Sequence, residues 1–367
     1  MGADPLAVDG GCSIAHAPKP TVLGLQPAAL VDHVARVDWS LLDQVPGDRG
    51  GSVPVGIEEL ESILREVKTH TVASHSGECS LKTLAGGSIA NSIRGLSSGF
   101  GLHCGIIGAY GDDEEGEFFT SNMNFNGVSL SKLRLKKGHT GQCVCLVDES
   151  GNRTMRPCLS NAVKIKSDDL LREDFKGAKW LMLRYAPFNL EVIQTSIRIA
   201  KEEGLLISMD LASFEMIRNF RLPLTQILES GNIDLCFANE DEAAQLVQGD
   251  KNVNLDAALD YLSKHCRWAV VTLAANGCMA KHGEEMVRVP AIGESKAVDT
   301  TGAGDLFASG FLYGLMKGLS LKECCHVGAC SGGAVIRSLG GEVTTENWQW
   351  AYKQMMTKGL PVPHLRN

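Results

Sequence analysis

The sequence predicts an α/β protein in which a central, mostly parallel sheet is sandwiched by helices, with a small β subdomain above it. Strand-like and helix-like segments alternate along most of the 367 residues, as they do in a parallel sheet with helical crossovers. Two stretches, 32–53 and 140–158, show strand and turn signals without helices between them. We expect these stretches to form the small β subdomain.

Hydrophobic periodicity gives the individual elements. The expected strands cover residues 21–30, 104–109, 142–147, 153–158, 180–183, 205–209, 233–237 and 269–273. The expected helices cover residues 57–67, 87–96, 190–203, 240–247, 255–265, 304–317 and 321–338, and the last two finish the fold. The turn at 148–152 predicts a hairpin between its two flanking strands. Ser320 and Glu323 have capping-box spacing before the last helix, which Gly340 and Gly341 are expected to end.

Composition excludes several classes of protein. The chain is 44% hydrophobic and 21% charged, the balance of a soluble globular protein. Its formal net charge is −8, and no dense Lys/Arg cluster indicates a nucleic-acid or membrane surface. No apolar run approaches the roughly 20 residues of a membrane span, and the N-terminus lacks the pattern of a secretory signal. We expect a cytoplasmic protein with a loose tail over 1–20 and one domain over 21–367.

The 12 cysteines do not form metal-type pairs. In a chain of this length, cysteine is more often a small buried hydrophobe than half of a disulfide framework. Cys143 and Cys145 lie two apart on an alternating strand, so we expect both on one side of it. The sequence therefore predicts no zinc site and no metal held directly by protein ligands.

The strongest chemical signal is the string Asp-Thr-Thr-Gly-Ala-Gly-Asp at 299–305, followed by an apolar helix. The small residues Gly302, Ala303 and Gly304 leave backbone N–H groups unobstructed at the positive end of a helix dipole, which suits an anion. Asp305 lies in the first turn and can accept a proton from a hydroxyl that attacks a phosphoryl group at this site.

A simpler interpretation exists, in which the aspartate only complements the helix dipole and the glycines only make a tight turn. The full seven-residue string between a strand-like segment and a long apolar helix favours the anion site instead. It is not a Walker A loop, because no GxxxxGK[ST] pattern occurs in the chain. It is not a dinucleotide-binding loop either, because Phe307 occupies the third glycine position, so a dehydrogenase is the least favoured function.

On these residues the sequence resembles the ribokinase-like (PfkB) family of carbohydrate and nucleoside kinases, from about residue 21 to the last helix. One signature is the 299–305 string with Phe311 and Leu312 on the following helix. The other is AGGSIAN at 85–91, with GAYGDDEEG at 108–116 soon after it. The resemblance implies a ribokinase-like fold with a small β lid and the ATP-dependent phosphorylation of a hydroxyl group.

The resemblance also implies roles for individual residues. Asp305 would be the catalytic base, and the anion hole would be Gly302, Ala303 and Gly304. Substrate contacts would come from Asp32, Gly87, Ser88 and Asn91, contacts with ATP and Mg²⁺ from Asn239, Glu242, Thr272 and Gly277, and a lid contact with phosphate from Arg153. Without the resemblance, several of these residues have a structural alternative: an exposed strand-end acid for Asp32, a polar helix face for Asn91, a helix cap for Asn239 with Glu242, and a solvated turn for Arg153.

The implied cofactors are ATP and Mg²⁺, and a monovalent cation such as K⁺ is left open. One departure concerns the nucleotide. In the stretch 272–277, Ala274 stands where the family often has the first glycine of a pair, and its methyl group could crowd adenine. Donor selectivity is therefore left open, whereas the reaction class is not affected.

Several features resemble the adenosine kinase branch: Ser88 in its signature, the helix-containing insertion over 41–71, and the stretches 210–214 and 233–244. A purine nucleoside is therefore the leading substrate, and a sugar, as in fructokinase or ribokinase, is the alternative. A third hypothesis is a catalytically silent relative with a binding or regulatory role, ranked last of the three because Asp305 and its glycines are retained. The expected partner is a small molecule, and the chain is expected to be a monomer or a homodimer.

Overall fold

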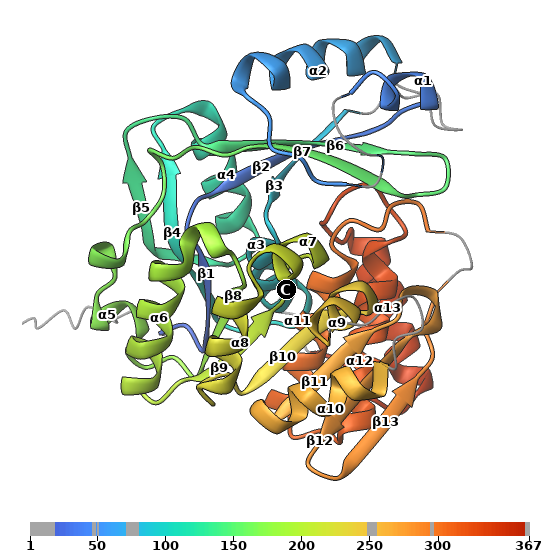
Figure 1. Ribbon diagram of the computed structural model, residues 1–367. Coiled ribbons are helices and arrows are strands. Elements are labelled where there is room, and N and C mark those ends of the chain that lie inside the picture. Colours follow the sequence, from blue (N-terminus) through green and yellow to red (C-terminus); the bar gives the residue numbers. More distant parts are fainter. Residues whose placement is uncertain are drawn as a thin grey trace, which may run out of the picture.

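The computed structural model describes residues 19–45, 49, 51–70, 81–247, 255–293 and 297–363 (Figure 1). Most of the predicted N-terminal tail and part of the predicted lid stretch 32–53 lie outside the described residues. Two sheets organise the chain, a large one and a smaller one that lies above it in the view of Figure 1. No helix within the described ranges is long and apolar enough to cross a membrane.

The large sheet has nine strands in the order β13-β12-β11-β10-β9-β8-β1-β4-β5. All neighbours pair in parallel except β11 with β12 and β12 with β13. The strands are β1 (Val22–Gln26), β4 (Cys104–Gly111), β5 (Ser129–Lys136), β8 (Trp180–Arg184), β9 (Leu206–Asp210), β10 (Leu235–Asn239), β11 (Trp268–Thr272), β12 (Cys278–His282) and β13 (Glu285–Val289).

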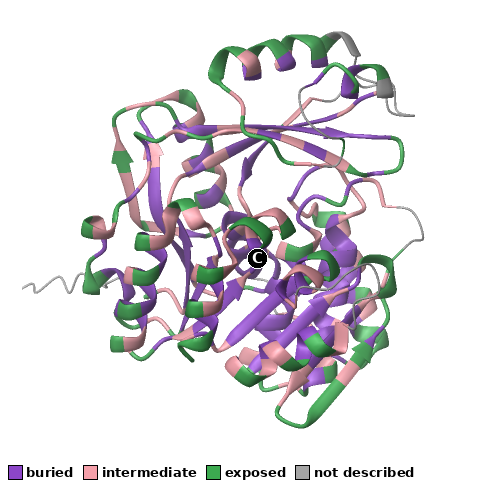
Figure 2. Ribbon diagram, viewed as in Figure 1, coloured by how far each residue is buried: buried purple, intermediate pink, exposed green. Residues whose placement is uncertain are grey.

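Helices cover both faces of this sheet and bury most residues of its inner strands, whereas the edge strands β5 and β13 stay partly exposed (Figure 2). One core joins the sheet to α3 (Ser88–Arg94), α4 (Glu114–Phe125), α11 (Ala303–Met316), α12 (Leu321–Val335) and α13 (Thr345–Thr357). The other core lies under α5 (Arg172–Phe175), α6 (Leu190–Glu202), α7 (Phe214–Asn219), α8 (Arg221–Glu229), α9 (Glu240–Leu246) and α10 (Leu255–His265). Short helical turns cover Gly95–Gly99, Ser167–Asp169, Pro187–Asn189 and Ala274–Asn276. The predicted helix-covered, mostly parallel sheet is confirmed.

The smaller sheet, here called the lid sheet, has the order β3-β2-β6-β7. Its strands are β2 (Leu30–Arg36), β3 (Lys82–Gly86), β6 (Gly141–Val147) and β7 (Arg153–Cys158). The predicted hairpin is present, since β6 and β7 pair in antiparallel register. The outer face of the lid sheet packs against α1 (Trp39–Leu42) and α2 (Ile57–His70), whereas its inner face is turned toward the large sheet (Figure 1).

Three expectations about the elements were wrong, two near the start of the chain and one at the end of the fold. The single strand expected over 21–30 is two strands in different sheets, because Pro27 has no N–H group to continue the ladder. The stretch 32–53 contains the short helix α1, whose first turn donates to the Asp38 carboxylate from the N–H groups of Ser40 and Leu41 at 3.0 and 3.2 Å.

The end of the fold also differs. The helix α12 begins with the predicted Ser320–Glu323 capping box but ends at Val335, before the glycine pair. A further helix, α13, then follows and finishes the fold. Its signals were present in the sequence, because Thr344 caps it and Trp348, Ala351, Tyr352 and Met355 form one buried face at helical spacing.

Candidate active site

Polar side chains end five parallel strands of the large sheet. The final residues of β1, β8, β9, β10 and β11 are Gln26, Arg184, Asp210, Asn239 and Thr272, and these strands are consecutive neighbours in the sheet. Parallel strands have their carboxyl ends at the same edge, and ligands of open α/β sheets bind at that edge. The sheet therefore brings these five side chains, separated by up to 246 positions in the chain, to one polar edge.

The loop before α11 is held rigidly at this edge. The buried Asp299 carboxylate accepts hydrogen bonds from the backbone N–H of Thr301 at 2.8 Å and of Gly340 at 2.7 Å. Gly302 has φ of 78°, and a Cβ there would lie 2.9 Å from the Cα atom of Gly341. Only glycine suits both the left-handed backbone and this close approach.

The N-terminus of α11 is open where an anion would bind. Gly304 is exposed, and a Cβ at this position would meet no atom within 4 Å. The first N–H groups of a helix have no partner within it and lie at the positive end of its dipole. The predicted anion hole at Gly302, Ala303 and Gly304 therefore has the backbone and the space that its role needs.

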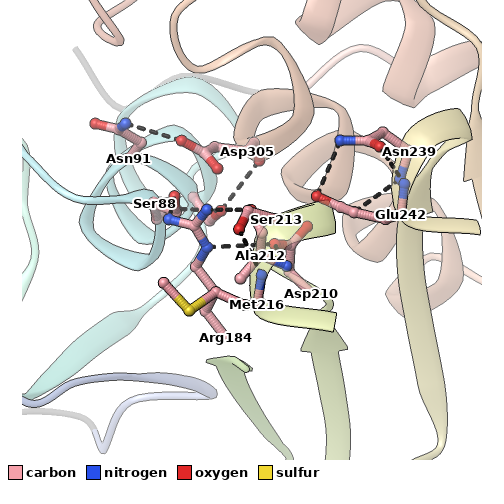
Figure 3. A network of polar contacts seen from close by, with 11 residues as sticks. Ser88, Asn91, Arg184, Asp210, Ala212, Ser213, Met216, Asn239, Glu242 and Asp305 are labelled. Carbon is pink, nitrogen blue, oxygen red and sulfur yellow. Dashed lines mark hydrogen bonds and ion pairs between the residues drawn. The ribbon is translucent and has the colours of Figure 1, made fainter. Parts of the chain in front are cut away.

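Asp305 joins the two signature segments. The Asn91 side chain on α3 donates to Asp305 Oδ2 at 2.9 Å (Figure 3), and the hydroxyls of Ser92 and Ser309 donate to the Asp305 backbone oxygen at 3.1 and 2.8 Å. Burial raises the pKa of Asp305 above its ordinary value, and the Asn91 hydrogen bond and Arg184 oppose that rise. The double-glycine segment and the 299–305 string thus line one site.

Asp32 lies in the lid sheet with its side chain buried, so it is not an exposed strand-end acid. A Cβ on Gly86 would lie 2.2 Å from the Asp32 carboxyl carbon, which shows that the Asp32 side chain packs directly against the backbone of that glycine. Burial raises the pKa of Asp32 to about 7, and the positive charge of Arg94 opposes the rise. Asp32 Oδ1 has no hydrogen-bond partner among the described residues. A buried acceptor of this kind calls for a donor from elsewhere.

Gly87 and Ser88 begin α3 beside β1 and β8. Gly87 has φ of 92° and lies against the Gln26 side chain, which accepts a hydrogen bond from the Ala90 N–H at 2.9 Å. Ser88 Oγ accepts from Arg184 Nη1 at 2.9 Å. Both predicted residues therefore lie at the polar edge of the sheet.

Arg184 and its partner Asp210 are site residues that we did not assign from the sequence. Arg184 Nε lies 3.5 Å from Asp210 Oδ1, and Arg184 also donates to the Ala212 carbonyl (Figure 3). The charge of Arg184 opposes the raised pKa values of Asp305, Asp210 and Glu242, each raised chiefly by burial. The available signal was positional, since each residue directly follows a predicted strand, at 180–183 and at 205–209.

Asn239 and Glu242 form the predicted helix cap at the start of α9. Asn239 Oδ1 accepts from the Glu242 N–H at 2.8 Å, while the Glu242 carboxylate accepts from the Asn239 N–H and from its side-chain amide, both at 2.9 Å. Burial, and then Asp210, raise the pKa of Glu242 to about 8. Because the cap occupies both carboxylate oxygens, this pair fits an indirect role toward a cation, through water, better than direct ligation.

Thr272 and Gly277 flank a turn beside that pair. Thr272 ends β11 and is the register partner of Asn239, and Gly277 has φ of 91°. The exposed Ala274, between them, has φ of 46°. The turn thus keeps a backbone conformation that favours glycine although the residue is alanine.

Arg153 connects the lid sheet to the loop before α11. Its Nη1 atom donates to the Thr300 carbonyl at 3.1 Å, and the Thr300 N–H donates to the Gly151 carbonyl at 3.2 Å. The arginine is therefore not a freely solvated turn residue. The tip of the β6–β7 hairpin touches the same loop that leads into the N-terminus of α11.

Cys143 and Cys145 lie on the same side of β6, as predicted, with their sulfur atoms 3.8 Å apart. Their potential ligand atoms and that of Asp32 all lie within 4.8 Å of one another. The contact with Cys143, together with burial, raises the pKa of Cys145 well above its ordinary value, so this thiol stays protonated. Both cysteines pack with Val34, Leu84 and Val147 and give the lid sheet an apolar inner face.

Comparison with known proteins finds similar chains among sugar kinases and adenosine kinases. The model of the pfkB family of carbohydrate kinases matches residues 61–348. An uncharacterized sugar kinase of Archaeoglobus fulgidus is 30% identical over 240 residues, which cover 64% of this chain and 91% of the relative. Adenosine kinase 2 of Arabidopsis thaliana is 26% identical over 296 residues, covering 72% and 81%.

Two solved structures extend the similarity to almost the whole chain. The adenosine kinase from Sinorhizobium meliloti has a TM-score of 0.80 and 29% identity, covering 92% of this chain and 99% of the other. A probable sugar kinase from Rhizobium etli has a TM-score of 0.79 and 28% identity, covering 90% and 97%. The fold, including the ribokinase-like arrangement that the sequence predicted, is therefore shared with kinases of both kinds.

Proposed function

Because the chain belongs to the pfkB family of carbohydrate kinases, we propose that it transfers the terminal phosphate of ATP to a hydroxyl of a ribose-containing small molecule, most favourably a purine nucleoside. The observation that carries the proposal is the hydrogen bond of 2.9 Å between Asn91 and Asp305 at the open N-terminus of α11. It joins a base, an anion site and a substrate-facing segment in one place.

In the proposed reaction Asp305 accepts the proton of the attacking hydroxyl. Burial favours this role, because it raises the pKa of Asp305 and a carboxylate with a raised pKa is a stronger base. The N–H groups at 302–304 stabilise negative charge on the phosphoryl oxygens as it develops. The apolar inner face of the lid sheet would exclude water, which limits the wasteful hydrolysis of ATP.

The residues fit the cofactors that the family implies. ATP with Mg²⁺ supplies the phosphoryl group and neutralises part of its charge. Asn239, Glu242, Thr272 and Gly277 would hold the nucleotide and the cation, since they stand together at the ends of β10 and β11. Thr301 Oγ1 is buried and has no partner among the described residues, which fits a nearby monovalent cation such as K⁺.

Asp32 would bind the hydroxyl groups of the acceptor. A carboxylate accepts two hydrogen bonds from vicinal hydroxyls, and its buried Oδ1 has no other donor within the described chain. A nucleoside and a sugar both carry such hydroxyls, so this contact alone does not separate them. The sugar kinase therefore stays as the second candidate, supported by the Archaeoglobus and Rhizobium relatives.

The deciding experiment measures ATP consumption by the purified chain against a panel of purine and pyrimidine nucleosides, ribose, fructose and fructose 6-phosphate. Mass spectrometry of the product checks for the addition of one phosphate. A monophosphorylated purine nucleoside supports the leading assignment, and a phosphorylated sugar supports the second candidate. If no acceptor is phosphorylated, the chain is better described as a catalytically silent relative.

The first prediction concerns the pH dependence of acceptor binding. Asp32 accepts hydrogen bonds from hydroxyl groups best when it is an ionised carboxylate, and its pKa is about 7. We expect the KM for the acceptor to rise as pH falls through 7, while the KM for ATP changes little, because the ATP site does not include Asp32. Steady-state kinetics between pH 5.5 and 9 measure both constants.

Asp32→Asn provides the control for this pH dependence. The variant should bind the acceptor weakly at every pH and lose the dependence near pH 7. The pKa of Asp32 is higher in the folded than in the unfolded state, so this group lowers the stability of the wild type as pH rises from 4 through 7. The variant should therefore melt at the same or a higher temperature at pH 8. An acceptor KM that stays flat across pH 7 in the wild type would exclude this role for Asp32.

The second prediction concerns Ala274. Replacing it with glycine removes a left-handed alanine, so we expect stability to rise by about 0.5–1 kcal/mol and the KM for ATP to fall. Chemical denaturation and steady-state kinetics measure these effects. Ala275→Gly, in the same exposed turn but without positive φ, is the matched control and should lose stability slightly. Equal stability losses in both variants would contradict the strain at Ala274.

A further inference from the structure

Arg94, at the end of α3, is a charged residue that the proposed reaction does not yet use. Its side chain is 2% exposed, and a buried charge is costly unless hydrogen bonds compensate it. Arg94 Nη1 donates to the Ala85 carbonyl at 2.7 Å and to Asn122 Oδ1 at 3.1 Å. Arg94 Nη2 donates to Asn91 Oδ1 at 2.8 Å and to the Gly341 carbonyl at 3.2 Å.

The contact with Asn91 sets the orientation of that amide. A guanidinium group only donates hydrogen bonds, so the Asn91 atom facing Arg94 must be the oxygen. The nitrogen of the same amide then faces the opposite way, where Nδ2 donates to Asp305 Oδ2 at 2.9 Å (Figure 3). If the amide were flipped, its nitrogen would meet a cationic donor and its oxygen would meet a carboxylate, and both contacts would be repulsive.

Arg94 also fixes the position of Asn91 relative to α11. It bridges Ala85 on β3, Asn122 on α4 and Gly341 after α12. A Cβ on Gly341 would lie 2.6 Å from Asn91 Nδ2, so this glycine lets the backbone after α12 pack directly against the amide. Three separate segments thus hold the guanidinium group, and the guanidinium group holds the amide.

We propose that Arg94 is a positioning residue for the base: through Asn91 it fixes the orientation of the Asp305 carboxylate and keeps one hydrogen bond on its ionised form. This inference rests on the proposed function only in giving Asp305 the role of base. A hydrogen bond to the ionised form of a carboxyl group lowers its pKa. Losing the Arg94–Asn91 contact should therefore raise the pKa of Asp305.

Other charges surround the same carboxyl group and have to be separated from this effect. They are Arg94 itself and Asp32, Arg153, Arg184 and Asp210, which belong to β2, β7, β8 and β9. The positive charge of Arg94 could act on Asp305 directly through space as well as through Asn91. Only an experiment that removes each contact separately and then both together distinguishes the two routes.

The experiment is a double-mutant cycle on the apo protein, with Arg94→Met, Asn91→Ala and the two combined. The ¹³C shift of the Asp305 carboxyl group is followed from pH 3 to 9 in protein labelled at the aspartate carboxyl carbons, and Asp305→Asn identifies its signal. We expect each single variant to raise the pKa of Asp305 by about one unit. The pKa of Asp305 in the double variant should be no higher than in Asn91→Ala alone, because Arg94 acts through Asn91.

Two outcomes would overturn the proposal. An unchanged pKa of Asp305 in Arg94→Met means that Arg94 only anchors the chain. Additive shifts of that pKa in the double variant mean that the charge of Arg94 acts on Asp305 directly. If Arg94→Met does not fold, Arg94→Lys replaces it, because lysine keeps the charge but loses the planar fork of donors. Arg94→Lys should raise the pKa of Asp305 by a smaller amount. An unchanged pKa of Asp305 in this variant would also overturn the proposal.

The same variants separate this inference from the proposed function. If the wild type phosphorylates an acceptor, the acidic limb of kcat should move upward with the pKa in Arg94→Lys, while the KM for ATP stays the same. If the wild type phosphorylates no acceptor, the proposed function fails, but the coupling between Arg94, Asn91 and Asp305 is still measured by the carboxyl titration.

Discussion

Asp305→Asn is expected to reduce kcat by about 10³-fold, since a positioned general base contributes roughly 10²–10⁴ in rate. The amide has nearly the same shape and can still contact Asn91, but it cannot take the proton of the attacking hydroxyl. The KM for ATP should change little, because the lost interaction belongs to the transition state. Steady-state kinetics with the acceptor identified in the panel measure both constants.

Stability distinguishes this loss from a folding defect. Burial raises the pKa of Asp305, so its charge lowers the stability of the folded state as pH rises above the ordinary carboxyl range. The amide variant should therefore melt at the same or a higher temperature at pH 8. The matched control is Asp256→Asn, another first-turn aspartate, which pairs with Arg288 on the surface and should keep normal turnover. Near-normal turnover in Asp305→Asn would remove Asp305 from its role as base.

Gly302→Ala is expected to reduce kcat by about 10²-fold, because displaced N–H donors no longer point at the developing charge. The alanine must adopt φ of 78°, and its methyl group would lie 2.9 Å from the Gly341 Cα atom. The loop has to move away, so the free energy of unfolding should also fall by about 2 kcal/mol. Chemical denaturation and steady-state kinetics on the same preparation measure both effects.

Gly304→Ala separates the anion site from loop stability. The added methyl group meets no atom within 4 Å, and its helical backbone suits alanine, so stability should be equal or higher. Turnover should nevertheless fall, because the methyl group enters the space proposed for the phosphoryl oxygens. Full activity in Gly304→Ala would place the phosphate elsewhere, and wild-type stability in Gly302→Ala would contradict the close packing on Gly341.

Much of the fold was predictable because it depends on patterns among residues that are close together in the sequence. Alternating periodicities predicted the helix-covered sheet, and the capping boxes at Asn239 and Ser320 lie where their spacing indicated. The errors arose where local signals were ambiguous. Pro27 divides one apolar stretch between two sheets, and the helix α13 has its cap and its buried face in a segment that we did not assign.

The sequence by itself determined the loop and helix that could hold an anion, because a glycine-rich helix start depends on a few adjacent residues. Only the tertiary structure decided which side chains surround that loop. Asn91 reaches Asp305 across 214 positions, and Arg94 reaches Gly341 across 247. Contacts of this range leave no periodic or capping pattern in the sequence. They exist because parallel strands end at one edge and because glycines let backbones approach, so Arg94 and Arg184 became visible as residues of the site only in the folded chain.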